Sequence, residues 1–145
     1  MSPEIQFPNI LLTAFRGSSA ELVISDTSKY KILLLPNDKV KDSEKLIEVI
    51  SNEKIDYVIS LGQKPNIKDK VHIETTARAG EFCINTNYDC TTLKRLFEQN
   101  GLVSKISHNA GTSFCNQLYL NGLKYLYQNA SATKILDTIV DMQTN

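Results

Sequence analysis

The stretch Ile106–Asn116, ISHNAGTSFCN, decides the fold of this chain, because it reads as a strand, a turn and the start of a helix. Apolar residues lead up to Ser107, small residues follow, and apolar positions then recur at helical spacing. The spacing predicts a helix that begins near Thr112 and ends near Gln128. Cys115 is therefore expected in the first turn of that helix.

A cysteine in a first helical turn has a specific chemistry. Free backbone N–H groups and the positive end of the helix dipole favour an anion there, which lowers the pKa of a thiol and raises its nucleophilicity. The same N–H groups can stabilise an oxyanion. Of the three cysteines, Cys83, Cys90 and Cys115, we expect only the last at a helix N-terminus and predict that it alkylates fastest. An ordinary buried cysteine near a helix start is the alternative interpretation.

The residues around Cys115 also carry a family resemblance. They reproduce the pattern S-x-x-A-G-T-x-x-C-N at Ser107, Ala110, Gly111, Thr112, Cys115 and Asn116. This pattern resembles the signature of pyroglutamyl peptidase I, also called pyrrolidone-carboxylate peptidase. Further similar segments follow in the family's order: Leu11–Phe15, Ser19–Val23, Leu35–Pro36, Asp56–Gln63 and Glu74–Ala77. The resemblance covers most of the chain, which is shorter than members of the family usually are.

The resemblance implies a function and a set of site residues. The family removes an N-terminal pyroglutamyl residue from peptides by thiolate attack and hydrolysis of an acyl-enzyme, without a metal or organic cofactor. It implies that Cys115 is the nucleophile and that Glu74 orients the general base. It also implies that Phe15, Gln63 and Lys68 contact a peptide N-terminus or a small lactam. Lys68 is the nearest candidate for the family's arginine, although it cannot form a bidentate fork.

One catalytic group of the family has no counterpart. In the family, a strand after the cysteine helix carries the general-base histidine, but no histidine follows His108 here. The last segment, Ser131–Met142, has apolar residues at helical spacing, so we expect a terminal helix rather than a strand. If the segment were a strand, Ile139 would stand where the histidine is expected. In either case the base is missing, which predicts impaired activity.

Two other histidines could act as substitutes, and Glu74 has an alternative role. His108 is predicted at the carboxyl end of a strand, where α/β sheets place ligands, so it is a weak candidate for the base. His72 lies two residues before Glu74 and would share its face in an extended strand. Both histidines could equally be partly exposed polar residues. Without a histidine partner, Glu74 could be a solvated loop carboxylate.

Composition narrows the class of protein. The chain has 145 residues, which suits a single domain over residues 1–145. Its 16 basic and 16 acidic residues give a net charge of zero, so no net positive charge attracts the chain to nucleic acid or an anionic membrane. No apolar run is long enough for a membrane helix, and Met1–Glu4 lacks the features of a signal peptide. Three cysteines without zinc spacing favour a reducing cytoplasm. The oligomeric state stays open, a homo-oligomer included.

The order of the elements predicts the fold class. Buried strands are expected at 10–15, 31–35, 57–61 and 103–107, with weaker strand patterns at 71–74 and 81–84. Helices are expected from Ser18 or Ser19 through Ile24, from a cap at Asp42 or Ser43 onward, and from near Asp89, Thr91 or Thr92 to Gly101. This alternation predicts a three-layer α/β/α sandwich with a mostly parallel central sheet.

Two functional hypotheses follow from these observations. In the first, the chain is a slow cysteine peptidase with Cys115 as nucleophile and His108 or water in place of the base. In the second, it is an inactive homologue that binds a small lactam, a peptide N-terminus or a partner chain. The missing histidine favours the second hypothesis, and a pyroglutamyl amide assay separates the two.

Overall fold

The computed structural model describes residues 8–17, 30–64, 71–79, 81–99, 101, 103–108 and 114–141, and for residues 63, 64, 114, 115 and 139–141 it describes the backbone alone. The elements are β1 (Ile10–Phe15), β2 (Lys31–Leu35), α2 (Lys39–Asn52), β3 (Tyr57–Lys64), β4 (Val71–Glu74), β5 (Thr76–Ala79), β6 (Phe82–Asn85), α3 (Cys90–Gln99), β7 (Ser104–Ser107), α4 (Phe114–Gln128) and β8 (Lys134–Asp141). The helix predicted from Ser18 or Ser19 lies outside the described residues.

The central sheet has six strands in the order β2-β1-β3-β8-β4-β7. Strands β2, β1, β3 and β8 run parallel, β4 is antiparallel to β8, and β7 is parallel to β4. All four predicted framework strands belong to this sheet, which confirms the mostly parallel α/β prediction. β2 and β7 are its edge strands, however, and are only partly buried, so the prediction of buried strands is wrong for these two. The pattern at 71–74 also forms a strand, and it lies inside the sheet.

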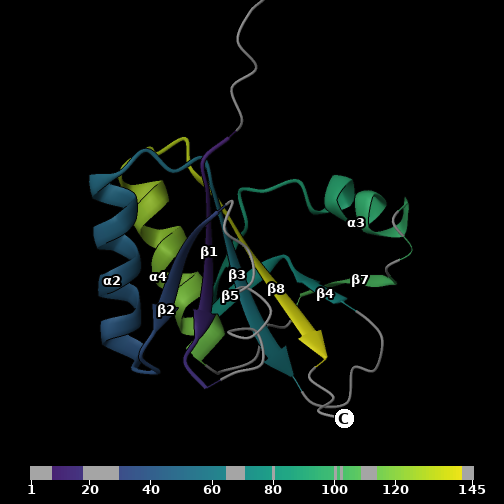
Figure 1. Cartoon of the computed structure of the whole chain (residues 1–145), viewed down its shortest axis with the longest axis horizontal. Coiled ribbons are helices and arrows are strands. Elements are labelled where there is room, and N and C mark those ends of the chain that lie inside the picture. The colour runs from purple at the N-terminus through teal and green to yellow at the C-terminus, as the bar shows by residue number, and fades with distance from the viewer. Residues whose placement is uncertain are drawn as a thin grey trace, which may run out of the picture.

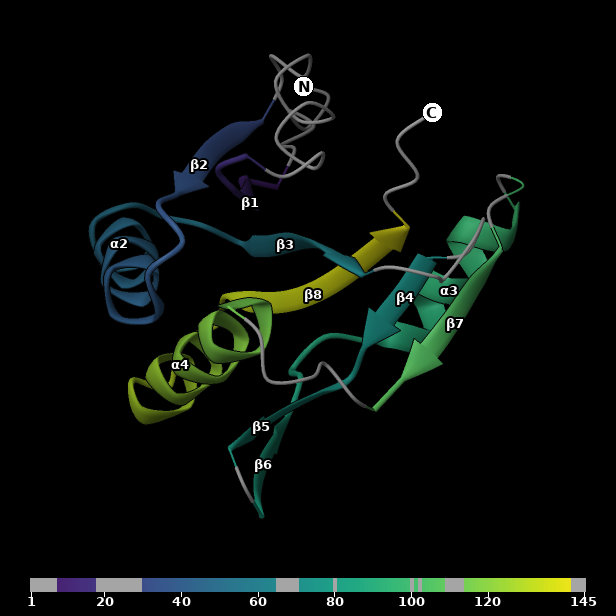
Figure 2. The same cartoon turned by 90° about the horizontal axis from the view of Figure 1, so that it is seen from below.

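Helices cover both faces of the sheet, which gives the predicted three layers. Leu46 of α2 and Leu118 of α4 share a core cluster with Ile135 of β8. The next residue of β8, Leu136, packs on the opposite face with Phe97 of α3. Successive residues of a strand point to opposite faces, so α3 lies across the sheet from α2 and α4. Figures 1 and 2 show this arrangement from two directions.

The C-terminal helix prediction is wrong, because residues 134–141 form strand β8. This strand lies in the interior of the sheet, between β3 and β4. Ile135 and Leu136 are both buried, one on each face. A strand buried on both faces reads as a nearly continuous apolar run, and such a run cannot be told from a short helix by periodicity alone.

The predicted cap of α2 is also wrong by one helical turn. The side chain of Asp38 accepts hydrogen bonds from the N–H groups of Val40 and Lys41 at 2.9 Å each, so Asp38 is the N-cap. These two hydrogen bonds lower the pKa of Asp38. Asp42 and Ser43 are buried inside the helix. The apolar face begins only at Leu46, and periodicity therefore missed the first turn.

Other helix ends agree with the sequence. Asp89 accepts from the N–H group of Thr92 at 3.2 Å at the start of α3. Gly101 has a φ of +78° after the last turn of α3, and its N–H group bonds to the Glu98 carbonyl at 3.1 Å. The strand predicted at 81–84 is β6, but it pairs with β5 in a separate two-stranded sheet. β5 was not predicted, because Ala77 and Ala79 give it little strand propensity.

Candidate active site

Cys115 is the second residue of α4, in the first helical turn as the sequence predicts. Helix α4 ends at Gln128, and the chain then returns through β8 in the opposite direction (Figure 1). The start of α4 therefore lies toward the carboxyl ends of the parallel strands. α/β sheets place their ligand sites at this edge.

Asn116 attaches the β5–β6 hairpin to the start of α4. Its side-chain amide donates to the carbonyl of Arg78 at 2.7 Å, and its side-chain oxygen accepts from the N–H group of Arg78 at 2.9 Å. The amide is thus paired with both main-chain groups of one residue, and Asn116 is only 4% exposed. The sequence identified Asn116 as a signature residue but offered no role for it.

His108 is exposed and lies directly after β7. Its Nδ1 lies 2.6 Å from the hydroxyl oxygen of Thr75, the residue that follows β4. The Nε of Arg78 donates to the main-chain oxygen of His108 at 3.2 Å. The carboxyl ends of β4 and β7 and the hairpin thus meet around this histidine. Both strands run antiparallel to β8, so their carboxyl ends point toward the edge opposite to that of the parallel strands.

Glu74, the last residue of β4, is fully buried rather than a solvated loop carboxylate. Its direct partner across the strand pair is Asp137 of β8, which is also 0% exposed. Ile139 pairs instead with His72. The position beside Glu74 on β8 is therefore Asp137, and Ile139, where the strand alternative expected the histidine, lies two residues further along. Sequence reasoning missed Asp137 because it had assigned the segment to a helix.

A row of buried polar residues crosses the sheet through this pair. Thr13, Ser60, Asp137 and Glu74 are consecutive partners across β1, β3, β8 and β4. All four are 0% exposed, and within the described residues their side-chain oxygens have no hydrogen-bond partner. On three of these strands, the residue two positions earlier faces the core shared with α2 and α4. These residues are Leu11, Val58 and Ile135. The row therefore lies on the α4 side of the sheet.

Tyr119 joins α4 to this row. It lies one helical turn after Cys115, and its hydroxyl donates to the main-chain oxygen of Glu74 at 2.8 Å. Burial raises the pKa of Tyr119 well above its ordinary value. The helix that carries Cys115 is thus anchored on the strand that carries Glu74.

No protein-family model and no curated protein matches the sequence. Among solved structures, pyroglutamyl peptidase I from Bacillus amyloliquefaciens is similar over 94% of this chain and 81% of its own, with a TM-score of 0.78 and 16% identity. The pyrrolidone carboxyl peptidases from Fervidobacterium islandicum AW-1 and Thermococcus litoralis each match 93% of this chain with a TM-score of 0.77. They share 19% and 18% identity and are covered over 81% and 77% of their lengths. The chain has the pyroglutamyl peptidase fold.

Within the pyroglutamyl peptidase fold, the expected substrate residues lie at different places. Phe15 is 7% exposed and packs in the core on the α2 and α4 side. Gln63 lies in β3 with its backbone paired to Val140. Lys68 lies outside the described residues. The structure therefore gives Phe15 a clear packing role.

The other two cysteines have contrasting surroundings. Cys83 is exposed on β6. Cys90 begins α3, so the expectation that only Cys115 would stand at a helix N-terminus is wrong. Burial, aided by the negative charge of Asp89, nevertheless raises the pKa of Cys90 to about 11. A helix start alone therefore does not activate a thiol when burial outweighs the dipole.

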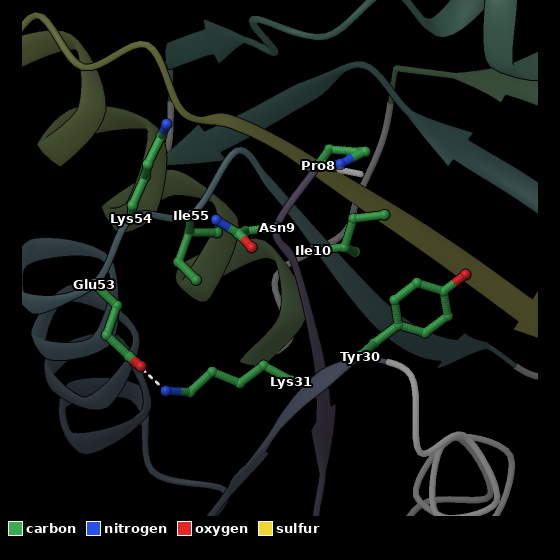
Figure 3. A pocket seen from close by; sticks show the side chains of 8 residues that line it. All are labelled: Pro8, Asn9, Ile10, Tyr30, Lys31, Glu53, Lys54 and Ile55. Atoms are coloured by element: carbon green, nitrogen blue, oxygen red, sulfur yellow. Dashed lines mark hydrogen bonds and ion pairs between the residues drawn. The ribbon is translucent and has the colours of Figure 1, made fainter. Parts of the chain in front are cut away.

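The large hollow shown in Figure 3 is far from the start of α4. It has a volume of about 990 Å³ and lies at the amino ends of β1 and β2, beside the end of α2. Lys31 and Glu53 form an ion pair across it. No cysteine, serine or threonine is among its described lining residues, and it lies at the opposite edge of the sheet from Cys115.

The described residues were also compared with the requirements of a metal site and of a membrane-spanning helix. Among them, no cluster of three or more His, Cys, Asp or Glu side chains could hold a metal ion. No helix in the described part of the chain is long and apolar enough to span a membrane.

Proposed function

We propose that this chain is a cysteine-dependent hydrolase of the pyroglutamyl peptidase I type whose removal of N-terminal pyroglutamate is absent or severely impaired. The observation that carries the proposal is the identity of the residue beside Glu74 on β8. This residue is Asp137, a second carboxylic acid. The cysteine at the start of α4 supports the reaction type, and the acid beside Glu74 supports the impairment.

An orienting carboxylate must contact the base that it orients. In the resembled family, a glutamate holds the general-base imidazole, so the two side chains must lie within hydrogen-bond reach. On this sheet that requirement selects the cross-strand partner of Glu74. A second carboxyl group there cannot form an imidazolium, and a nearby carboxylate raises rather than lowers the pKa of a thiol. Asp137 is also 0% exposed, so its carboxyl group has no contact with solvent.

The sizes of the expected rate effects favour impaired hydrolysis. General-base assistance is typically worth about 10²–10⁴-fold in rate. The helix dipole contributes about 0.3–1 kcal/mol at an exposed terminus, which corresponds to a several-fold gain at most. The loss therefore exceeds what the start of α4 can restore. We expect turnover at least about a hundredfold below that of a pyroglutamyl peptidase with an intact histidine.

The test is hydrolysis of a pyroglutamyl amide reporter by the purified chain and by Cys115→Ala, with an intact pyroglutamyl peptidase as reference. We expect little or no release, and any release should disappear in Cys115→Ala. Robust turnover by the unmodified chain would contradict the proposal. If His108→Ala then abolished that turnover with the fold intact, His108 would be the base.

A second function, binding without catalysis, is favoured by the same carboxyl pair. In this function the chain binds a small lactam, a peptide N-terminus or a partner chain. Calorimetric titration of Cys115→Ala with 2-pyrrolidone and with a pyroglutamyl peptide tests the first two ligands. Saturable binding without hydrolysis by the unmodified chain would support it, and the absence of heat with either ligand would exclude both.

A further inference from the structure

Glu74 and Asp137 face each other inside the sheet, and among the described residues no salt bridge compensates their charges. Because the two residues are direct partners in an antiparallel strand pair, their Cβ atoms are about 4.5–5.5 Å apart. Both residues are 0% exposed, and none of their four carboxyl oxygens has a hydrogen-bond partner among the described residues. Two ionised carboxylates in such a site would repel each other where no water screens them.

Among the described residues, the groups that surround the pair are two hydroxyls, one histidine and one exposed lysine. From β3 the neighbour is Ser60, a hydroxyl. From α4 it is Tyr119, whose hydroxyl already bonds to the Glu74 main chain. His72 shares the face of Glu74 two residues away and lies opposite Ile139, and Lys105 of β7 pairs with His72 and is exposed. The only charge that acts on Asp137 among the described residues is that of Glu74.

A proton shared by Glu74 and Asp137 would remove this repulsion. A protonated carboxyl group donates a hydrogen bond to the neighbouring carboxylate, which satisfies one oxygen of each group and leaves one negative charge on the pair. Burial, followed by the charge of Glu74, raises the pKa of Asp137 to about 8.

We infer that Glu74 and Asp137 hold a single proton between them at neutral pH, and that loss of this proton in alkaline solution destabilises the joint between β4 and β8. The pair is an acid–base site inside the sheet that no part of the peptidase chemistry uses. Because Tyr119 anchors α4 on Glu74, the destabilised region includes the part of α4 that begins with Cys115. The inference does not depend on peptidase activity.

The sign of the pH effect follows from linkage. The unfolded chain releases the Asp137 proton near its ordinary pKa of 3.8, whereas the folded chain keeps it up to about pH 8. The stabilisation is therefore complete below the lower value and is lost as pH rises through the higher one. Within this window, each pH unit lowers the folding equilibrium constant by up to about tenfold.

The experiment is urea unfolding of the full chain from about pH 5 to about pH 9.5, which brackets the upper pKa. We compare the unmodified chain with Asp137→Asn and with Glu81→Gln, a control at an exposed carboxylate of the hairpin. We expect the unmodified chain and the control to lose stability steeply with pH and Asp137→Asn to lose much less. Parallel curves for all three would overturn the inference.

Infrared spectroscopy decides the question if Asp137→Asn does not fold. The unmodified chain should show the C=O band of a protonated carboxyl group at neutral pH, and the band should disappear in alkaline solution. In Glu74→Gln the band should disappear at lower pH, because the charge that helps to hold the proton is gone. Absence of the band at neutral pH would overturn the inference. Stabilisation of the unmodified chain by Ca²⁺ or Mg²⁺ at about pH 9 would also overturn it, because a metal ion would then neutralise the pair.

Discussion

At the scale of single residues, the effect of a side chain depends on its neighbour across the strands. Glu74 beside an imidazole would orient a base, whereas here Glu74 stands beside a second acid, Asp137. The same dependence applies to the cysteines. Cys90 and Cys115 both lie at helix starts, but burial dominates at Cys90.

The substitution Asp137→His tests whether this neighbour limits catalysis. An imidazole at this position would stand directly beside Glu74, so we expect turnover of a pyroglutamyl amide to rise by at least about tenfold. Ile139→His is the matched control, because it places the same ring on the same strand opposite His72. A larger gain from the control than from Asp137→His would show that the β8 register does not determine the site.

The relative reactivity of the thiols can be measured without a substrate. We expect iodoacetamide at neutral pH to modify Cys115 first, because it lies in the first turn of α4. Cys83, which is exposed, should react at an ordinary rate, and Cys90 should react last because its pKa is about 11. Mass spectrometry of the labelled peptides gives the order. Protection of Cys115 while Cys83 is labelled would count against a nucleophilic role.

At the scale of elements, the start of α4 is held from two directions. Tyr119 ties it to the end of β4, and Asn116 ties it to the β5–β6 hairpin. Close packing holds the middle of the helix, where a Cβ atom on Gly122 would come within 2.8 Å of the Cδ1 atom of Ile135. These contacts hold α4 in position on the sheet.

Asn116→Ala tests the link between α4 and the hairpin. It removes two hydrogen bonds and leaves main-chain groups of Arg78 without partners, so we expect a loss of about 1–3 kcal/mol in the free energy of unfolding. Amide exchange in β5 should accelerate. Gln117→Ala is the control on the same helical turn, where the side chain bonds only to Asn121. Equal effects of the two substitutions would mean that the Arg78 contact does not stabilise the hairpin.

At the scale of the whole molecule, stability is concentrated in the interior strands. β1, β3 and β8 each have a strand on both sides and carry much of the core, including Leu11, Val58 and Ile135. The β5–β6 hairpin forms a sheet of its own and exposes Phe82 and Cys83. The hairpin extends beside α4, as Figure 2 shows.

This distribution predicts the order of hydrogen exchange. Amides of β3 and β8 should exchange only through global unfolding, whereas those of β6 should exchange through local opening at much higher rates. Hydrogen exchange measured by mass spectrometry on short peptides separates the amides of β3 and β8 from those of β6. A low concentration of urea should markedly accelerate exchange only in β3 and β8. The same protection factor in β6 as in β3 would show that the hairpin unfolds together with the sheet.

The sequence by itself determined the features that depend on neighbours along the chain. Strand and helix periodicity located the four framework strands, and the pattern around Cys115 located helix α4. The C-cap at Gly101 was also predictable, because only a positive φ suits that position and glycine adopts it without strain. These are local preferences of the backbone and of one amphipathic face.

Only the tertiary structure decided which strands became neighbours. Residues 134–141 form a strand because β3 and β4 provide partners on both sides, and no local preference separates that outcome from a helix. The same pairing sets Asp137 beside Glu74, although 63 residues separate them in the sequence. Hydrogen bonds between strands are made with groups distant in the chain. The identity of the residue beside Glu74, on which the proposed loss of activity rests, was therefore determined only when the sheet assembled.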